Sequence, residues 1–100
     1  MKLGIPKQGE SILSVARRIG YAHQKTMSAN QSAFVRSVGG GDFPRFHLYV
    51  TEEQARFIFN LHLDQKKPVY EGVSAHNGEY EGEIITEEAT RIWEIVKPKS

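Results

Sequence analysis

The stretch "RFHLYVTEEQARFIFNLHLD", residues 45–64, decides the fold, because two runs of alternating apolar and polar side chains flank the short segment "EEQA". Alternation with a period of two is typical of strands with one buried face, so the stretch predicts an antiparallel β-hairpin. We expect residues 52–55 to form a four-residue turn. The pairs that this register predicts on the apolar face, and hence in the core, are Val50–Phe57, Leu48–Phe59 and Phe46–Leu61.

The opposite face of the predicted hairpin is polar. Its side chains are those of Arg45, His47, Tyr49, Asn60, His62 and Asp64. Successive strand residues point to opposite faces, so a slip of one residue would mix the apolar and polar sets, and the assignment to faces is well specified. We expect His47 opposite Asn60 and Arg45 opposite His62.

One helix is predicted before the strands in the sequence and a second helix after them. The segment "ESILSVARRIG", residues 10–20, has apolar residues at helical spacing, Ser11 placed as the N-cap and Gly20 placed to end the helix. The segment "TEEATRIWEIVK", residues 86–97, has an apolar stripe that includes Trp93, with Thr86 as its cap and Pro98 as its stop. We expect the stripe, Trp93 included, to be core.

The predicted order of elements is α–β–β–β–α, in which "SAFVRSV" is the first strand and the hairpin supplies the other two. An uncertain fourth strand is placed within residues 21–31. This order predicts an α+β fold: a two-layer sandwich of a three- or four-stranded antiparallel sheet with two helices on one face. One hundred residues predict a single domain, residues 1–100, and we expect residues 1–8 and 98–100 to be flexible.

Composition narrows the classes of function. The chain has no cysteine, which excludes a disulfide scaffold and thiolate metal sites, and it has no apolar run of membrane-spanning length. The net charge is +1, with seven basic and two acidic residues in 1–50 against six and ten in 51–100. We therefore expect a soluble, cytoplasmic protein without a cofactor or membrane contact, either a monomer or an edge-strand dimer.

The segment after the hairpin, "QKKPVYEGVSAHNGEYEGEI", is punctuated by glycine and proline and predicts a long loop. It places Lys66, Lys67, His76 and Tyr80 beside the polar sheet face. The sequence therefore predicts a small binding module that uses the polar face and the 62–80 loop. Its partner is unknown: a nucleic acid would stack on the aromatic side chains, and a protein would meet the acidic end of the loop.

Two enzymatic alternatives remain open. His62 and Asp64 share a strand face, and with His76 they resemble a two-histidine-one-carboxylate metal site, the basis of a metal-assisted hydrolase. A metal-free ribonuclease needs one or two histidines as acid and base plus a cation. The residues that could supply this set are His62, His76, Lys66, Lys67 and Arg45. In either case the candidate catalytic residues are His62 and His76.

Several motifs resemble those of short uncharacterised bacterial proteins of similar length. These are "FPRFHLYV", with its Pro-Arg-Phe-His strand, "NLHLDQKKPVYEG", with its Leu-His-Leu-Asp-Gln-Lys strand end, and "AHNGEY". No activity is known for those proteins, so this resemblance implies no role for any residue. The element order also resembles that of HicA-type toxins, small domains that bind and cut RNA with a histidine in a Gly-Ser-His-His turn. The corresponding stretch here, "ANQSAFVR", has no histidine.

Overall fold

The computed structural model describes residues 1–25, 30–65 and 74–98, the last range as backbone alone for residues 74–81. The elements in chain order are β1 (Lys2–Pro6), α1 (Ile12–Ile19), β2 (Ala22–Gln24), β3 (Gln31–Ser37), β4 (Arg45–Glu52), β5 (Arg56–Asp64) and α2 (Ser74–Val96). The predicted α+β class is confirmed. The order differs from the prediction, because a strand precedes α1 and the sheet has five strands rather than three or four.

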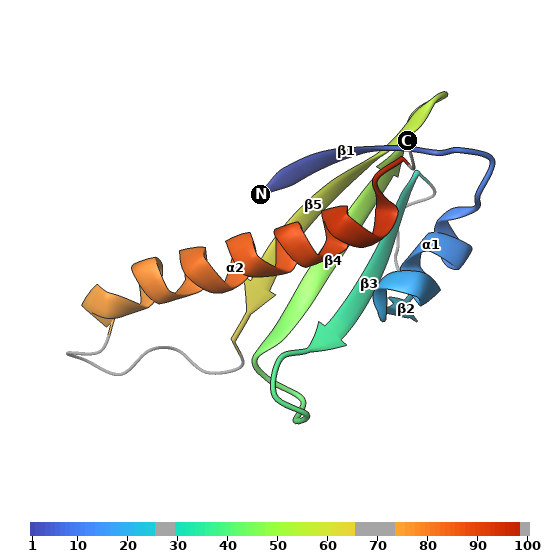
Figure 1. The fold of residues 1–100 in the computed structure, drawn as a ribbon. Coiled ribbons are helices and arrows are strands. Elements are labelled where there is room, and N and C mark those ends of the chain that lie inside the picture. The colour runs from blue at the N-terminus through green and yellow to red at the C-terminus, as the bar shows by residue number, and fades with distance from the viewer. Residues whose placement is uncertain (26–29, 66–73, 99–100) are drawn as a thin grey trace.

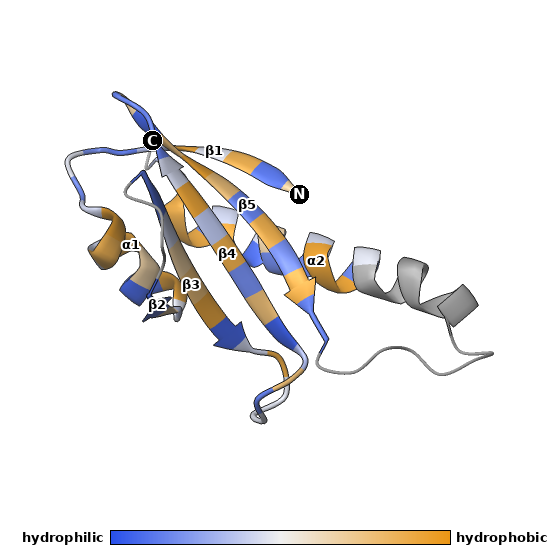
Figure 2. Cartoon of the chain, turned by 180° about the vertical axis from the view of Figure 1, so that it is seen from behind, coloured by the Kyte–Doolittle hydropathy of each residue, from blue (hydrophilic) through white to orange (hydrophobic). Residues whose placement is uncertain are grey.

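The five strands form one antiparallel sheet in the order β1-β5-β4-β3-β2. Figure 1 shows α2 lying across one face of this sheet, and α1 packs beside it. Buried side chains of both helices belong to the same apolar core as one face of the strands. The helices therefore cover a single face, and the view from behind in Figure 2 looks onto the face that α2 leaves uncovered.

The central hairpin has the predicted faces but not the predicted register. Val50 pairs with Phe59, not with Phe57. The chain reverses within residues 53–55, a shorter turn than the expected one, and the Glu53 N–H donates to the Arg56 carbonyl at 2.9 Å. The shift is two residues. Because the side-chain period of a strand is also two, every side chain stays on its predicted face while its cross-strand partner changes.

Strand β1 lies within residues 1–8, the segment that we expected to be flexible. Its Leu3 lies opposite Phe59 of β5, and Met1 exchanges backbone hydrogen bonds with Leu61, sixty residues further along the chain. Ile5 is 1% exposed in the core. A five-residue run that contains a glycine and a proline is a weak strand signal by itself. Burial of its apolar side chains against β5 and α2 is what orders it.

Helix α1 forms as predicted. Ser11 has an extended backbone, and its hydroxyl oxygen accepts a hydrogen bond from the Ser14 N–H at 3.2 Å. Gly20 takes the left-handed conformation, with φ of 86°, and its N–H donates back into the last turn. Val15, Ala16 and Ile19 are buried, so the apolar stripe faces the sheet.

Helix α2 is longer than predicted, and Trp93, which we expected in the core, is partly exposed. It begins at Ser74, not at Thr86, so residues 74–83, which we expected to be loop, belong to a helix. Ala89, Ile92 and Val96 are buried as expected. Trp93 is instead 38% exposed, because it follows Ile92 by one residue and so lies about 100° further round the helix.

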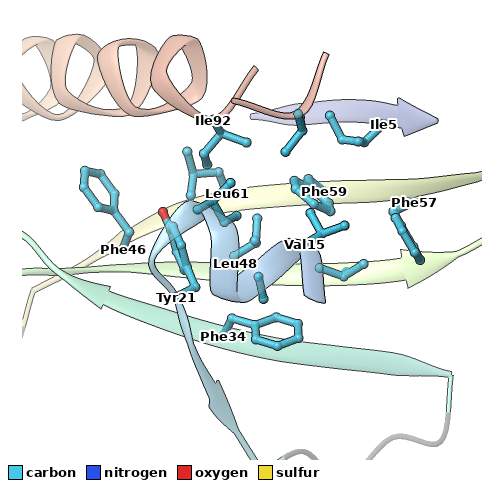
Figure 3. Packing of buried hydrophobic residues seen from close by; sticks show 14 of the residues in the cluster. Ile5, Val15, Tyr21, Phe34, Phe46, Leu48, Phe57, Phe59, Leu61 and Ile92 are labelled. Carbon is cyan, nitrogen blue, oxygen red and sulfur yellow. The ribbon is translucent and has the colours of Figure 1, made fainter. Parts of the chain in front are cut away.

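The core lies between the sheet and the two helices, as Figure 3 shows. Its largest fully buried side chains come from every layer: Phe34, Phe57, Phe59, Ile5, Ile19, Leu48, Leu61, Ile92 and Val96. Within the part of the chain that the structure describes, no helix is long and apolar enough to cross a membrane.

A polar cluster lies at the border of this core. The Glu88 carboxylate is 5% exposed and accepts hydrogen bonds from the Tyr21 hydroxyl at 2.7 Å and from two nitrogens of Arg91 at 2.7 and 2.8 Å. Arg91 also donates to the Ile19 carbonyl at 2.6 Å, which ties α2 to the end of α1. The pKa of Tyr21 is raised well above its ordinary value, first by burial and then by its hydrogen bond to Glu88.

Candidate functional site

The uncovered face of the sheet carries the polar side chains predicted from the hairpin. Alternation along β4 and β5 places them opposite the core residues, and Figure 2 shows the resulting stripes of hydrophilic and hydrophobic positions on both strands. In the observed register Tyr49 lies opposite Asn60, His47 opposite His62, and Arg45 opposite Asp64. The structure thus brings all six predicted sheet-face residues together.

Three rings form an aromatic cluster at the centre of this face: His47, Tyr49 and His62. The His47 and Tyr49 rings are stacked, with centroids 4.2 Å apart and planes at 26°. The His62 ring meets Tyr49 edge-on from β5, with centroids 5.6 Å apart and planes at 75°. His62 is exposed and Tyr49 is half-buried, so part of the cluster is open to a ligand.

Beside the rings, the Asp64 carboxylate contacts the side chains of His47 and Arg45. Its Oδ2 accepts a hydrogen bond from Nδ1 of His47 at 2.8 Å and lies 3.8 Å from Nε of Arg45. An ionised carboxylate can only accept, so Nδ1 is the donor. The Arg45 guanidinium also lies over the Phe43 ring, 4.6 Å from its centroid. The negative charge of Asp64 is therefore balanced within the face and does not confront a ligand alone.

The His47 ring is largely enclosed by the protein. Its side chain is 11% exposed, and its Nε2 is buried without a hydrogen-bond partner among the described residues. The ring therefore has one nitrogen engaged by Asp64 and the other enclosed. Of the three rings, His62 has the exposure to solvent that acid–base chemistry requires, whereas His47 stacks on the Tyr49 ring.

Sequence reasoning missed two cations at the edge of the same face. Lys2 lies opposite Asn60 on β1, with its side chain directed away from the core. Arg56 begins β5 opposite Pro6, yet its side chain lies over Gly4: a β-carbon on Gly4 would be 3.1 Å from Nη1 of Arg56. Alternation could have assigned Arg56 to this face, but nothing local in the sequence predicts the pairing of β1 that brings Lys2 there.

The rest of the predicted site falls outside what the structure shows. Lys66 and Lys67 lie outside the described residues. His76 and Tyr80 belong to α2, not to a loop, and their side chains are likewise not described. The proposed meeting of His62 and His76 therefore stays a prediction.

No metal centre is defined by the described side chains. Within residues 1–25, 30–65 and 82–98, no group of three or more His, Asp and Glu side chains could hold a metal ion. His62 and Asp64 share a face as predicted, but the nearest partner of Asp64 is His47. Its Oδ2 is engaged by Nδ1 of His47.

Clefts of about 300 and 330 Å³ lie away from the aromatic cluster. The larger is lined by Arg36, Val38, Phe46, Ile84, Glu87 and Glu88. Its buried carboxylate, Glu88, is already engaged by Tyr21 and Arg91. The uncovered face is therefore the surface on which stacking rings and charged groups gather.

Comparison with protein families, curated proteins and solved structures finds no match for this chain.

Proposed function

We propose that this protein is a small binding domain whose uncovered sheet face binds single-stranded nucleic acid. The observation that carries the proposal is the aromatic cluster at the centre of that face, with Tyr49 supported by His47 and flanked by an exposed His62. Bases of a single strand stack on such rings irrespective of sequence, because every base has a π-face. An open antiparallel sheet with central aromatic side chains gives those bases a flat surface.

The distribution of charge supports a phosphate-bearing ligand. On the uncovered face Asp64 is balanced by Arg45 and His47, and Arg56 is paired with Glu53. Lys2, which has no carboxylate partner within the described residues, adds positive charge at the edge. The described carboxylates of α2 lie on the helix-covered side of the sheet. Lys2, Arg45 and Arg56 therefore outnumber the two carboxylates Asp64 and Glu53 on and beside this face by one charge, which favours a phosphate-bearing ligand.

A histidine-dependent ribonuclease, the HicA-like alternative, rests on His62. Its imidazole is exposed next to Tyr49, so it could exchange a proton with a bound ribose or phosphate. Enclosure of His47 Nε2 leaves no second accessible imidazole among the described side chains of this face. Binding without cleavage is therefore the function that the geometry supports best, and RNA integrity during the binding assay tests the alternative.

The experiment is a fluorescence anisotropy titration of a labelled single-stranded oligonucleotide at several salt concentrations. We expect affinity to fall as salt rises. Tyr49→Ala should weaken binding about 5- to 150-fold, since one base–aromatic stack contributes about 1–3 kcal/mol. Tyr49→Phe, which keeps the ring, is the matched control and should bind almost as well as the unmodified protein.

Two results would contradict the proposal. One is the absence of salt-dependent binding to RNA or DNA single strands. The other is equal binding by the Tyr49→Ala and Tyr49→Phe variants, which would place the contact elsewhere. Capture of a protein ligand by the same face, with no oligonucleotide binding, would favour the protein partner instead.

A further inference from the structure

Two cations, Lys2 and Arg56, lie at the β1–β5 edge of the uncovered face. Within the described residues Lys2 has no carboxylate partner. Arg56 bonds Glu53 through Nε at 2.7 Å, and neither of its Nη atoms has an acceptor in the same part of the chain. Both groups therefore have N–H donors available to a ligand at this edge, whereas Arg45, 3.8 Å from Asp64, lies two strands further in, on β4.

The glycine between these cations sets their spacing. Lys2, Gly4 and Pro6 alternate with core residues along β1, so all three face the uncovered side. The Arg56 side chain starts opposite Pro6 and turns back over Gly4, where a β-carbon would lie 3.1 Å from Nη1 and 3.7 Å from Cδ. Its guanidinium is thereby brought within about two strand residues, or about 7 Å, of the position of Lys2.

Of the aromatic cluster, His62 lies on β5, next to β1, and Tyr49 lies on β4, two strands in from the edge. Lys2 is opposite Asn60, and Asn60 is opposite Tyr49, so one row crosses β1, β5 and β4. Neighbouring strands are about 4.8 Å apart, which puts the backbone of Tyr49 about 10 Å from that of Lys2. This distance accommodates the sugar and base of a nucleotide whose phosphate is at the edge. Asn60, whose carboxamide has no partner within the described residues, lies beneath the nucleotide.

We infer that the edge residues Lys2 and Arg56 form a phosphate track, along which a single strand runs parallel to β5 with its bases directed inward onto Tyr49 and His62. The inference rests on the proposed nucleic-acid binding and specifies its geometry: which side of the face holds the backbone and which holds the bases. Gly4 is a positioning residue in this arrangement, because its missing side chain leaves room for the Arg56 guanidinium.

The test is the slope of log affinity against log salt for a labelled single-stranded oligonucleotide. Loss of one phosphate contact lowers this slope by about 0.7 for a single strand. We expect that reduction for Lys2→Gln and for Arg56→Gln. Arg17→Gln removes the same charge from an exposed position on α1, on the helix-covered side, and should leave the slope unchanged.

Gly4→Val tests the track without changing any charge. A valine suits a strand, so the fold should be kept, and thermal unfolding of each variant checks this. Its side chain would occupy the space of the Arg56 guanidinium, so we expect the slope to fall as it does in Arg56→Gln, with no further fall when both changes are combined.

The outcomes separate the two proposals. If Lys2→Gln, Arg56→Gln and Gly4→Val give the same slope as Arg17→Gln while Tyr49→Ala weakens binding, the face binds nucleic acid and the track is wrong. If the unmodified protein shows no salt-dependent binding, the proposed function fails and the track with it.

Discussion

At the scale of single residues, the buried Glu88 carboxylate and the Tyr49 ring show what sequence can and cannot predict. The predicted helix has Thr86 as its cap, so the sequence places Glu88 in its first turn. In the structure α2 starts twelve residues earlier, and Glu88 is buried against Tyr21 and Arg91 because it shares the core-facing side of the helix with Ile92, four residues further on. Tyr49 was assigned correctly, since period-two alternation alone determines the face of a strand residue.

The Tyr21–Glu88 contact predicts a pH dependence of stability. Burial and the hydrogen bond raise the pKa of Tyr21, so the folded chain keeps a proton that the unfolded chain loses above about pH 10. The free energy of unfolding therefore falls as the pH rises above about 10, by up to about 1.4 kcal/mol per pH unit from this group. Tyr21→Phe should cost about 1 kcal/mol near neutrality, and this deficit should shrink above pH 10.

Urea unfolding at a series of pH values measures this difference. Because the other tyrosines are common to both proteins, the difference between Tyr21→Phe and the unmodified protein isolates Tyr21. A deficit that stays constant from neutral to strongly alkaline pH would show that Tyr21 ionises equally in the folded and unfolded chains.

At the scale of elements, local signals predicted types and faces, and long-range contacts decided the rest. Alternation identified β4 and β5 and sorted their side chains, but it carries no information on turn length, so the register was wrong by two residues. Strand β1 was missed because its partner β5 lies more than fifty residues away. The first turns of α2 were read as loop because Asn77–Gly78 and Gly82 are turn signals, which the helix overrides.

The corrected orientation of α2 gives a prediction for its neighbouring residues. Ile92 is 0% exposed, so Ile92→Ala should destabilise the fold by about 2–5 kcal/mol. Trp93 is 38% exposed, so Trp93→Ala should cost less in spite of its larger side chain. Thermal unfolding of the two variants compares them directly. The reverse ranking would restore the original assignment of Trp93 to the core.

At the scale of the whole molecule, the placement of both helices on one face of a five-stranded sheet is what creates a candidate site. Sequence predicted the two layers and the uncovered face, because two amphipathic helices and one apolar sheet face cover each other. It did not predict that β1 would extend this face, and so it missed Lys2 and the role of Gly4. The helix-covered face holds the apolar core, and the uncovered face carries the rings and cations on which the proposed binding rests.

The most direct test of this account is a map of backbone amide chemical shifts of the isotope-labelled protein as a single-stranded oligonucleotide is added. We predict the largest changes on β4 and β5, around Tyr49, Asn60 and His62, with smaller ones on β1 and none across α1 and the described part of α2. Changes confined to the helices, or no changes at all at saturating oligonucleotide, would contradict the assignment of function to the uncovered face.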